Sequence, residues 1–322
     1  MRHRSLPLGI DIGTTGLRIV AATTGARGPL IGRVVSREIP PGYATSGEIA
    51  EPEYVAALLD QAIEDLDTPE RRCVCSVGAP EALLRAVQLP QRSAKQRTRA
   101  ALRYAASHID YVPNDALIRI HPLQGSLHAL GVVRKAALQS RVLTLRRAGM
   151  KVIAFDHEAL ALGRAFPDCS ILVDVGYERT SVHRYGATIP ATIQTSGGGA
   201  QVTRAIQTEL AIDAISAEKR KCELGTLGAG DSTRASLVLD LMRSIDSLRG
   251  LEHEVRAIGL VGSGSRLSGL AAELQAKTGV PVNTPALRFI TSEAHATGTA
   301  KTNAVGWALA AGLSLWEVDS SS

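Results

Sequence analysis

Apolar and polar residues recur at two periods along the chain, one typical of strands and one typical of helices. Residues 8–20, LGIDIGTTGLRIV, are an apolar run of β-type residues that breaks into Gly13-Thr14-Thr15-Gly16 before alternation resumes. This pattern predicts a β-hairpin whose turn consists of glycine and threonine. Further strands are predicted by short alternating or buried runs, which cover residues 33–39, 72–77, 85–89, 117–120, 127–133, 150–155, 257–261 and 279–284.

Apolar positions at a period of 3.6 residues predict amphipathic helices between these strands. The predicted helices cover residues 53–66, 93–109, 135–148, 157–166, 200–210, 216–224, 233–249, 267–278 and 304–316, and loops are expected at 225–231 and 298–303. Ser93 is the expected N-cap of its helix, and Gly149 is expected to end another. Since strands and helices alternate throughout, the sequence predicts an α/β fold with mixed sheets.

The hairpin pattern occurs a second time in the other half of the chain. Residues 171–186 read ILVDVGYERTSVHRYG, again an apolar run with one acid before a glycine-containing turn. The distance between the two copies is too long for a short tandem repeat and fits a duplicated domain. The matching residues are Asp11, Gly13 and Thr15 in the first copy and Asp174, Gly176 and Thr180 in the second.

These turns have the composition of a phosphate-binding site. Small residues leave backbone N–H groups uncovered, and threonine hydroxyls add donors, so an anion can approach closely. An aspartate beside such a turn would repel phosphate unless a cation lies between them, and Mg²⁺ held through water is the expected cation. Two further glycine-rich stretches, 196–200 and 259–270, precede helical patterns and offer backbone N–H groups at helix N-termini.

Composition excludes several other functions. The 322 residues contain 21% charged, 45% hydrophobic and only 3% aromatic residues, with a net charge of +5. The basic excess is mild and aromatic side chains that could stack on bases are few, so the composition argues against nucleic-acid binding. No apolar run reaches the roughly 20 residues needed to cross a bilayer, and residues 1–7 lack the apolar core of a signal peptide. Direct membrane insertion is therefore not expected.

Cysteine and histidine patterns do not indicate a metal centre. Cys73 and Cys75 alternate along one predicted strand, while Cys169 and Cys222 are isolated, so buried thiols are expected. The late Gly259-x-x-Gly-x-Gly stretch lacks the spacing of a dinucleotide-binding fingerprint. The arginines between residues 134 and 147 are expected on one solvated helix face.

Beyond the phosphate loops, several segments carry a family resemblance. They are residues 87–90 (VQLP), 111–113 (YVP), 145–150 (LRRAGM), 156–162 (DHEALAL), 198–203 and 217–221. Together with the two Asp-x-Gly hairpins, these segments resemble the actin, Hsp70 and sugar-kinase ATPase superfamily. Within it the chain is most similar to the PilM family of type IV pilus assembly proteins, relatives of FtsA. The resemblance covers nearly the whole chain.

The resemblance implies ATP and Mg²⁺ as cofactors, an actin-like (ribonuclease-H-like) fold of two lobes, and roles for individual residues. Asp11 and Asp174 would order Mg²⁺ through water, and Glu158 would position the attacking water. Ser263 stands where these families usually carry a second glycine. The implied nucleotide-binding residues are Asp11, Gly13, Thr14, Thr15, Asp174, Gly176, Thr180, Gly198, Gly199, Glu218, Lys221, Gly262, Gly264, Ser265 and Arg266.

The resemblance also implies a subdomain organisation. It places the core of the first lobe in 1–74, 150–186 and 303–322, a small inserted subdomain in 75–149, the core of the second lobe in 187–212 and 255–302, and a helical subdomain in 213–254. The implied function is a cytoplasmic ATP-binding platform at the inner face of the bacterial inner membrane. It would bind the cytoplasmic tail of a PilN-like membrane protein, with slow or no hydrolysis.

Two alternatives stay open at this point. One is a small-molecule kinase of the same superfamily, although the short insertion between the lobes shows no polar cluster suited to a sugar. The other is a filament-forming ATPase similar to FtsA or MreB, for which self-association would be required. Substrate-stimulated turnover and sedimentation with ATP, respectively, would distinguish them.

Overall fold

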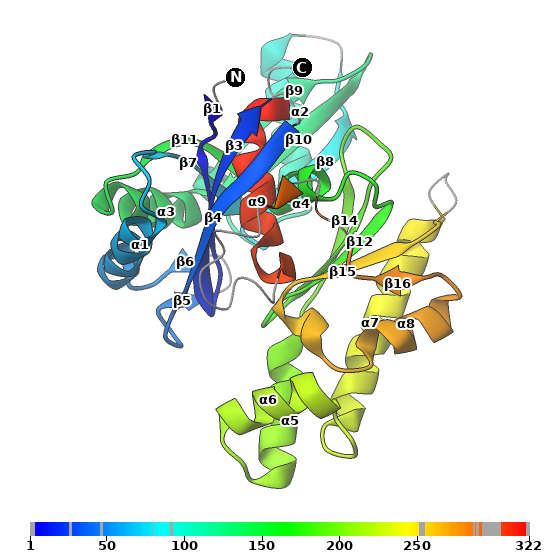
Figure 1. Cartoon of the computed structure of the whole chain (residues 1–322). Coiled ribbons are helices and arrows are strands. Elements are labelled where there is room, and N and C mark those ends of the chain that lie inside the picture. Colours follow the sequence, from blue (N-terminus) through cyan, green and yellow to red (C-terminus); the bar gives the residue numbers. More distant parts are fainter. Residues whose placement is uncertain are drawn as a thin grey trace. The chain divides into compact units, whose positions relative to one another are not determined.

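The chain consists of two compact units, each with its own mixed sheet and core (Figure 1). The structure, a computed structural model, describes residues 4–25, 28–45, 48–78, 80–90, 93–250, 255–285, 287, 290–291 and 304–319. The first unit comprises Met1–Ala165, Thr188–Pro190 and Arg288–Ser322, and the second comprises Phe166–Ala187 and Ala191–Leu287.

The main sheet of the first unit has the order β11-β7-β2-β3-β4-β17, with β1 paired to β3. Its strands are β1 (Arg4–Ser5), β2 (Leu8–Ile12), β3 (Gly16–Gly25), β4 (Gly28–Glu38), β7 (Arg72–Val77), β11 (Lys151–His157) and β17 (Ile290–Thr291). The helices of this unit outside its small sheet are α1 (Pro52–Leu66), α3 (Lys135–Arg147), α4 (Glu158–Ala165), α9 (Ala308–Ser314) and α10 (Trp316–Asp319). A short ribbon, β5 (Ala44–Thr45) with β6 (Glu48–Ile49), and the 3-10 turn η4 (Ala304–Trp307) complete it.

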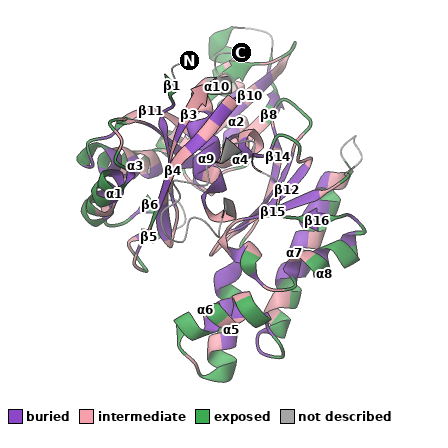
Figure 2. Ribbon diagram, in the orientation of Figure 1, coloured by how far each residue is buried: buried purple, intermediate pink, exposed green. Residues whose placement is uncertain are grey.

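Helices cover both faces of this sheet. On one face, Leu8 and Ile10 of β2 join the core that α1 and α3 complete, and on the other, Val74 packs with Ala161 of α4 and Leu313 of α9. On this second face, helix α9 packs unusually close to strand β2, because a Cβ atom on Gly9 would overlap the Ala310 carbonyl oxygen of α9. Buried residues follow the central strands (purple in Figure 2).

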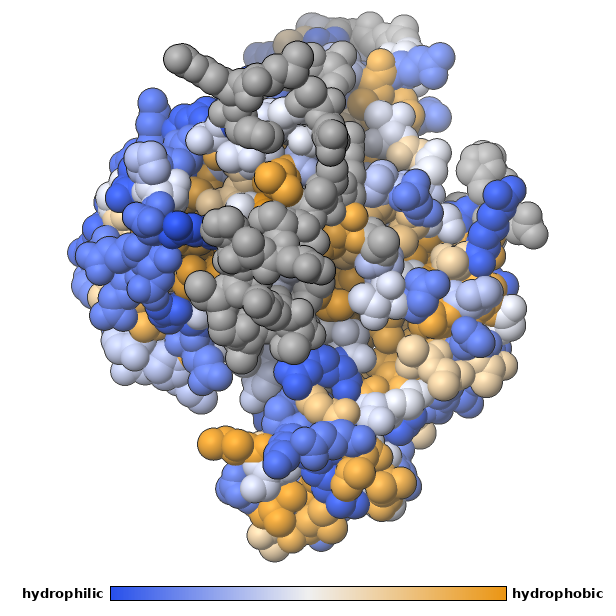
Figure 3. Space-filling view, viewed as in Figure 1, coloured by the Kyte–Doolittle hydropathy of each residue, from blue (hydrophilic) through white to orange (hydrophobic). Residues whose placement is uncertain are grey.

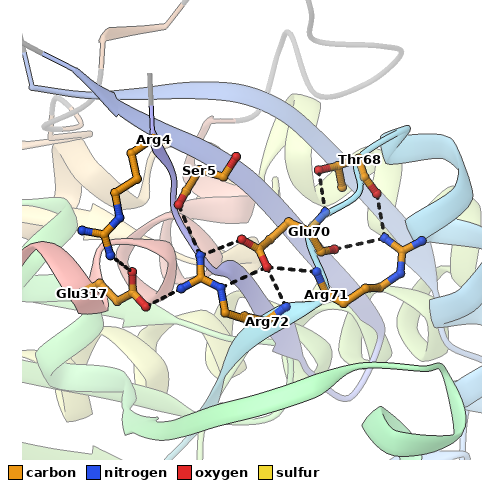
Figure 4. Close-up of polar contacts among 7 residues, drawn as sticks. All are labelled: Arg4, Ser5, Thr68, Glu70, Arg71, Arg72 and Glu317. Atoms are coloured by element: carbon orange, nitrogen blue, oxygen red, sulfur yellow. Dashed lines mark hydrogen bonds and ion pairs between the residues drawn. The ribbon is translucent and has the colours of Figure 1, made fainter. Parts of the chain in front are cut away.

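A network of charged side chains connects strand β1 and helix α10 to strand β7 (Figure 4). Arg72 donates hydrogen bonds to both carboxylate oxygens of Glu70 and lies 2.7 Å from Glu317 of α10. Glu317 in turn accepts a 2.7 Å hydrogen bond from Arg4 of β1. Burial raises the pKa of Glu70, but hydrogen bonds from Arg72 outweigh it, so the pKa lies below its ordinary value and the carboxylate is charged.

A small three-stranded sheet forms a separate core within the first unit. Its order is β8-β10-β9, all antiparallel, with β8 at Ala82–Gln88, β9 at Ala116–Pro122 and β10 at Leu127–Arg134. Helix α2 (Ala94–Ala106) covers one face through the buried residues Ala101 and Ala105. Ser93 and Gln96 form a capping box at its start, as the N-cap prediction requires. The 3-10 turn η1 (Pro113–Asp115) precedes β9.

The second unit is built on a sheet of order β14-β13-β12-β15-β16. Its strands are β12 (Ile171–Val175), β13 (Thr180–Arg184), β14 (Ala191–Thr195), β15 (Ile258–Val261) and β16 (Val282–Asn283), and its helices are α5 (Gly199–Leu210), α6 (Ala214–Leu224), α7 (Asp231–Arg249) and α8 (Leu270–Thr278), with the 3-10 turn η2 (Ser263–Arg266). The surface near α5 and α6 exposes apolar side chains, including Ile215 (83%) and Leu227 (68%) (Figure 3).

The two sheets share one topology. In each, the strand that carries the acid pairs antiparallel with the next strand and parallel with a later one: β2 with β3 and β7, and β12 with β13 and β15. Asp11 and Asp174 are both the fourth residue of a five-residue strand, and the two strands have the same pattern of burial. The structure therefore contains the duplication that the repeated hairpin predicted.

Several predictions differ from the structure. The predicted lobe boundary at residue 186 is displaced, because β12 and β13 pair with β15 and β14 and therefore belong to the second unit, which begins at Phe166. Strand β14 was not predicted, and the strand predicted at 279–284 spans only Val282–Asn283. The loop predicted at 298–303 lies outside the described residues.

The arginines of α3 are not all solvated. Arg141 is only 6% exposed and donates to the Ala137 carbonyl oxygen. It shares the buried face of α3 with Thr144 and Leu145, because residues three and four positions apart lie on one side of a helix. Nearby, burial raises the pKa of the Cys75 thiol to about 12, an effect that the positive charge of Arg141 opposes. All four cysteines are free thiols, and Cys73 and Cys75 are buried as predicted, whereas Cys169 and Cys222 are only partly buried.

Candidate functional site

Asp11 lies near the carboxyl end of β2, on the opposite face of the sheet from Leu8 and Ile10. Its Oδ1 accepts a 3.0 Å hydrogen bond from the Ser76 hydroxyl of β7, and its Oδ2 lies 3.4 Å from the Arg18 guanidinium of β3. Arg18 faces Asp11 directly in the hairpin register. The carboxylate is thus held between a hydroxyl and a cation at one end of the sheet.

The turn that follows Asp11 leaves donors available. Gly13 donates to the Gly16 carbonyl oxygen at 3.0 Å, which closes the turn. Thr14 and Thr15 are half-buried, and their hydroxyls make no hydrogen bond with any residue the structure describes. A site for an anion needs such uncommitted donors beside a cation, and Arg18 supplies the cation.

Glu158 lies at the first position of α4, directly after β11. A Cβ atom on Gly78, the residue after β7, would overlap the Glu158 carboxylate, so this carboxylate lies directly against Gly78. The sequence therefore brings Glu158 to the end of β7, the strand that pairs with the Asp11 strand.

Two neighbours of Glu158 hold the start of α4 in place. His157 is buried, and its Nδ1 accepts a 3.2 Å hydrogen bond from the Ala159 N–H, so it caps the helix. Asp156 forms an ion pair with Arg164, which lies in the last turn of α4. Arg164 also donates to the Gly312 carbonyl oxygen of α9 at 3.0 Å. The backbone around Glu158 is therefore fixed by buried polar contacts.

In the second unit, Asp174 lies beside the loop that follows β15. A Cβ atom on Gly262 would overlap the Asp174 carboxylate and the Val175 carbonyl oxygen, and Gly262 has φ +86°, which glycine adopts without strain. Gly264, within η2, would bring a Cβ atom to 2.6 Å from the Val175 side chain. Both glycines are thus required for this close approach.

The turn after Asp174 packs against the start of α5. Gly176 donates to the Arg179 carbonyl oxygen at 2.8 Å, which repeats the closing bond of the first turn. A Cβ atom on Gly198 would lie 2.5 Å from the Tyr177 carbonyl oxygen. Thr180 is fully buried, and its hydroxyl donates to the Gly197 carbonyl oxygen at 2.7 Å. Thr180 thus contributes to the shape of the loop through this bond.

The N-terminus of α5 is less open than the sequence suggested. The N–H groups of Gly199 and Ala200 donate to the carbonyl oxygens of Gly176 and Tyr177 at 3.0 and 2.8 Å. These two donors are therefore committed to holding the two glycine loops together. The N–H of Gly198, just before the helix, makes no hydrogen bond within the described part of the chain.

Glu218 and Lys221 of α6 connect that helix to α5. The Lys221 ammonium, 1% exposed, donates to Glu218 Oε2 (2.6 Å), the Thr203 hydroxyl (3.0 Å) and the Gly199 carbonyl oxygen (3.3 Å). Burial raises the pKa of Glu218, but hydrogen bonds from Lys221 and Thr203 outweigh it, so the pKa is lowered and the carboxylate is charged. The Glu218 side chain is 41% exposed, so one edge of this carboxylate is accessible.

Most of the predicted residues of the second unit are brought together. Gly199 lies beside Gly176, Gly264 and the Lys221 ammonium, and Asp174 and Gly262 lie against each other. Ser265 folds back through its hydroxyl onto the Gly262 carbonyl oxygen at 2.7 Å, and Arg266 is exposed at the end of η2.

The first unit contains three site residues that the motifs did not identify. Arg18 could have been found from the hairpin register, since a four-residue turn places it opposite Asp11. Ser76 and Gly78 depend on the pairing of β2 with β7, which no local pattern specifies.

The fold first defines the class of the protein. The chain is similar to a chain of the PilM-PilN type IV pilus biogenesis complex (TM-score 0.80, 24% identity, 96% of this chain and 97% of that one). It is also similar to the ethanolamine utilization protein EutJ from Carboxydothermus hydrogenoformans (TM-score 0.61, 13% identity, 98% and 91%) and to the MamK double helical filament (TM-score 0.51, 15% identity, 97% and 98%). The chain therefore has the actin-like ATPase fold.

Sequence comparison then gives the family. The profile of the family described as type IV pilus assembly protein PilM matches residues 9–318, and the chain belongs to this family. No individually curated protein matches the chain.

Within the described residues, no helix has both the length and the hydropathy that a bilayer crossing requires. No three His, Cys, Asp or Glu side chains among them are grouped as a metal site.

Proposed function

We propose that this protein binds ATP·Mg²⁺ with loops from both compact units and serves as a platform in type IV pilus assembly. The observation that carries the proposal is the duplication: each unit places an aspartate at the same position of an equivalent strand, beside a turn closed in the same way. Two such elements are the arrangement expected for gripping one metal-bound phosphate chain from two sides.

The first unit would supply Asp11, the two threonine hydroxyls of the turn, and Arg18. Asp11 would hold Mg²⁺ through water, because magnesium retains most of its hydration shell. Thr14 and Thr15 have uncommitted hydroxyls, and Arg18 brings a positive charge to within 3.4 Å of Asp11. These groups fit the β- and γ-phosphates in donor chemistry and charge.

The second unit would supply a tight glycine surface and a ribose contact. Gly176, Gly198, Gly199, Gly262 and Gly264 lie where a Cβ atom would meet backbone or carboxylate atoms, so the absence of side chains lets these loops pack closely on one another. Glu218 is charged and partly exposed, as a residue that accepts hydrogen bonds from ribose hydroxyls should be. Ser265 and Arg266 would flank the adenosine.

Glu158 is proposed to orient water for hydrolysis. Its support is the fixed start of α4 and the space that Gly78 leaves for its carboxylate. Hydrolysis of this kind depends mainly on positioning and charge neutralisation, and turnover is proposed to be slow or absent. Binding energy would then serve to close the two units and change their affinity for a partner.

The partner is proposed to be the cytoplasmic tail of a PilN-like inner-membrane protein. This proposal is supported by membership of the PilM family and by similarity to a PilM-PilN complex. The protein would then act in the cytoplasm at the inner face of the membrane. Residues 75–149 are proposed to contribute the groove for this tail.

Calorimetric titration with ATP and Mg²⁺ tests the nucleotide site. Wild-type protein is expected to bind, and Asp11→Asn should weaken binding at least about tenfold, because the metal loses one anionic anchor. Asp60→Asn, an exposed acid of α1, is the matched control. Absence of ATP binding by the wild-type protein, or equal binding by Asp11→Asn, would overturn the nucleotide proposal.

Fluorescence anisotropy with a labelled peptide of the PilN-like tail tests the partner. Binding is expected, with an affinity that differs between ATP·Mg²⁺ and nucleotide-free protein. An unchanged affinity would remove the proposed coupling to closure, and absence of binding would remove the partner itself.

A further inference from the structure

The net charge of the chain is concentrated in one segment. Residues 80–134 contain eight Lys or Arg against three Asp or Glu, an excess that equals the net charge of +5 of the whole chain. The remaining residues are balanced. This segment forms the small sheet and α2 (Figure 1).

Three of these cations lie on one exposed face of α2. Lys95, Arg99 and Arg103 are four residues apart and exposed, while Ala101 and Ala105 are fully buried on the side facing the sheet (Figure 2). The helix contains no acidic residue. The outer face of α2 is therefore a row of like charges.

This row is unfavourable for the helix itself. Like charges at i and i+4 destabilise a helix by about 0.2–0.5 kcal/mol per pair, and Lys95 in the first turn opposes the helix dipole. Lys95, Arg99 and Arg103 form no ion pair with any residue in the described part of the chain. A local conflict of this kind is expected where a surface is built for an external ligand.

We propose that the outer face of α2 binds an anionic membrane surface. Three cations on one helix face suit a diffuse layer of lipid phosphates, which attracts basic side chains with about 1 kcal/mol each. Leu102, 37% exposed, lies on the same face and can enter the headgroup layer. A protein interface or single-stranded nucleic acid would instead be expected to use aromatic side chains, and this face of α2 contains none.

The choice of a membrane over other anions rests on the proposed location at the inner membrane. The contact itself is independent of ATP, because α2 shares no residue with the proposed nucleotide loops. It would orient the small sheet towards the lipid and add a second attachment to the one through the partner. Since purified protein and lipid suffice for the test, its failure would leave partner and nucleotide binding untouched.

Vesicle co-sedimentation tests the proposal with the full-length protein. Vesicles of phosphatidylcholine containing about 40% phosphatidylglycerol should bind the wild-type protein, pure phosphatidylcholine should not, and about 0.5 M NaCl should release it. The triple variant Lys95→Gln, Arg99→Gln, Arg103→Gln is expected to bind on the order of 100-fold more weakly. Its melting temperature should equal or exceed that of the wild type, since the repulsion is removed.

A second triple variant controls for net charge. Arg146→Gln, Arg204→Gln, Lys277→Gln removes the same charge from exposed positions on three other helices and should bind vesicles like the wild type. Equal losses in the two variants would overturn the proposal, as would wild-type protein that ignores anionic vesicles. Tighter binding to a duplex oligonucleotide than to vesicles at the same salt concentration would also overturn it, in favour of nucleic acid.

Discussion

His157 is a buried base whose structural role requires it to be neutral. Its Nδ1 accepts a hydrogen bond from the Ala159 N–H and therefore carries no proton. Burial, with a smaller effect from the charge of Arg85, lowers the pKa of His157 to about 4. Protonation would both place a charge in the core and remove the cap of α4.

This depressed pKa predicts a loss of stability in acid. Between the native pKa of about 4 and the unfolded value of about 6.5, only the unfolded chain binds the proton, so the free energy of unfolding falls as pH drops through this window. The loss should approach about 3 kcal/mol by pH 4, and His157→Asn, which can still cap the helix, should remove it. Urea denaturation at several pH values measures this, with His121→Asn on exposed β9 as the control. A variant profile as steep as that of the wild type would contradict the assignment.

Lys221 is expected to matter for stability as well as for the ligand. Lys221→Met keeps the packing volume but removes the donor to the Thr203 hydroxyl and the ion-pair partner of Glu218. A cost of about 1–3 kcal/mol in unfolding free energy is expected, together with weaker ATP binding. The neighbouring Lys219→Met, at an exposed position, should change neither. Thermal melting and calorimetry on both variants test this.

At the scale of single residues, the sequence predicted which residues form the candidate site better than what each of them does there. Asp11, Gly176, Gly262 and their neighbours could be selected because the motif repeats, and the structure brings those of each unit close together. The buried hydroxyl of Thr180 could not be foreseen, because its partner is a carbonyl group 17 residues away.

Helix α9 can pack directly against β2 because Gly9 has no side chain at the point of contact. A Cβ atom on Gly9 would overlap the Ala310 carbonyl oxygen, and backbone atoms cannot rotate away as a side chain can. Gly9→Ala should therefore cost about 3 kcal/mol of unfolding free energy. Gly131→Ala is the matched strand control, because nothing lies within 4 Å of its Cβ position, and it should be neutral or slightly stabilising. Equal stability of the two variants would show that α9 does not approach β2 this closely.

The elements that could be predicted are those that carry their own pattern. Helix α1 and strand β7 match their predicted ranges to within one residue, because their apolar spacing is complete. Strands β14 and β17 have five and two residues and exist through pairing with β13 and β4. Pairing between distant segments is not encoded in a local period, so these strands escaped prediction.

For the whole molecule, the duplication explains why one motif was enough to predict the fold. The repeated acid-and-glycine hairpin indicates the central strands of both sheets, and the strands around it follow the same order in each unit. The boundary between the units could not be placed in the same way. The chain enters the second unit at Phe166, within a short stretch that links α4 to β12 and carries no change of composition.

The proposed function makes one prediction that only the whole molecule can meet. Asp11 and Asp174 belong to different units, and if both hold the same hydrated Mg²⁺ their contributions to ATP affinity must be coupled. Asp11→Asn and Asp174→Asn should each weaken binding, but the double variant should lose less than the two losses combined, because the first substitution already releases the metal. A coupling free energy above about 0.5 kcal/mol is expected from calorimetry with Mg²⁺.

The same titrations without Mg²⁺ supply the control for this cycle. With EDTA present, no metal joins the two carboxylates to the phosphates, so each single substitution should change ATP affinity little, or raise it by removing a negative charge. Independent sites would behave differently: the losses would add to within about 0.3–0.5 kcal/mol, with or without metal. Additive losses would therefore show that the two hairpins do not share one nucleotide, even if each binds phosphate alone.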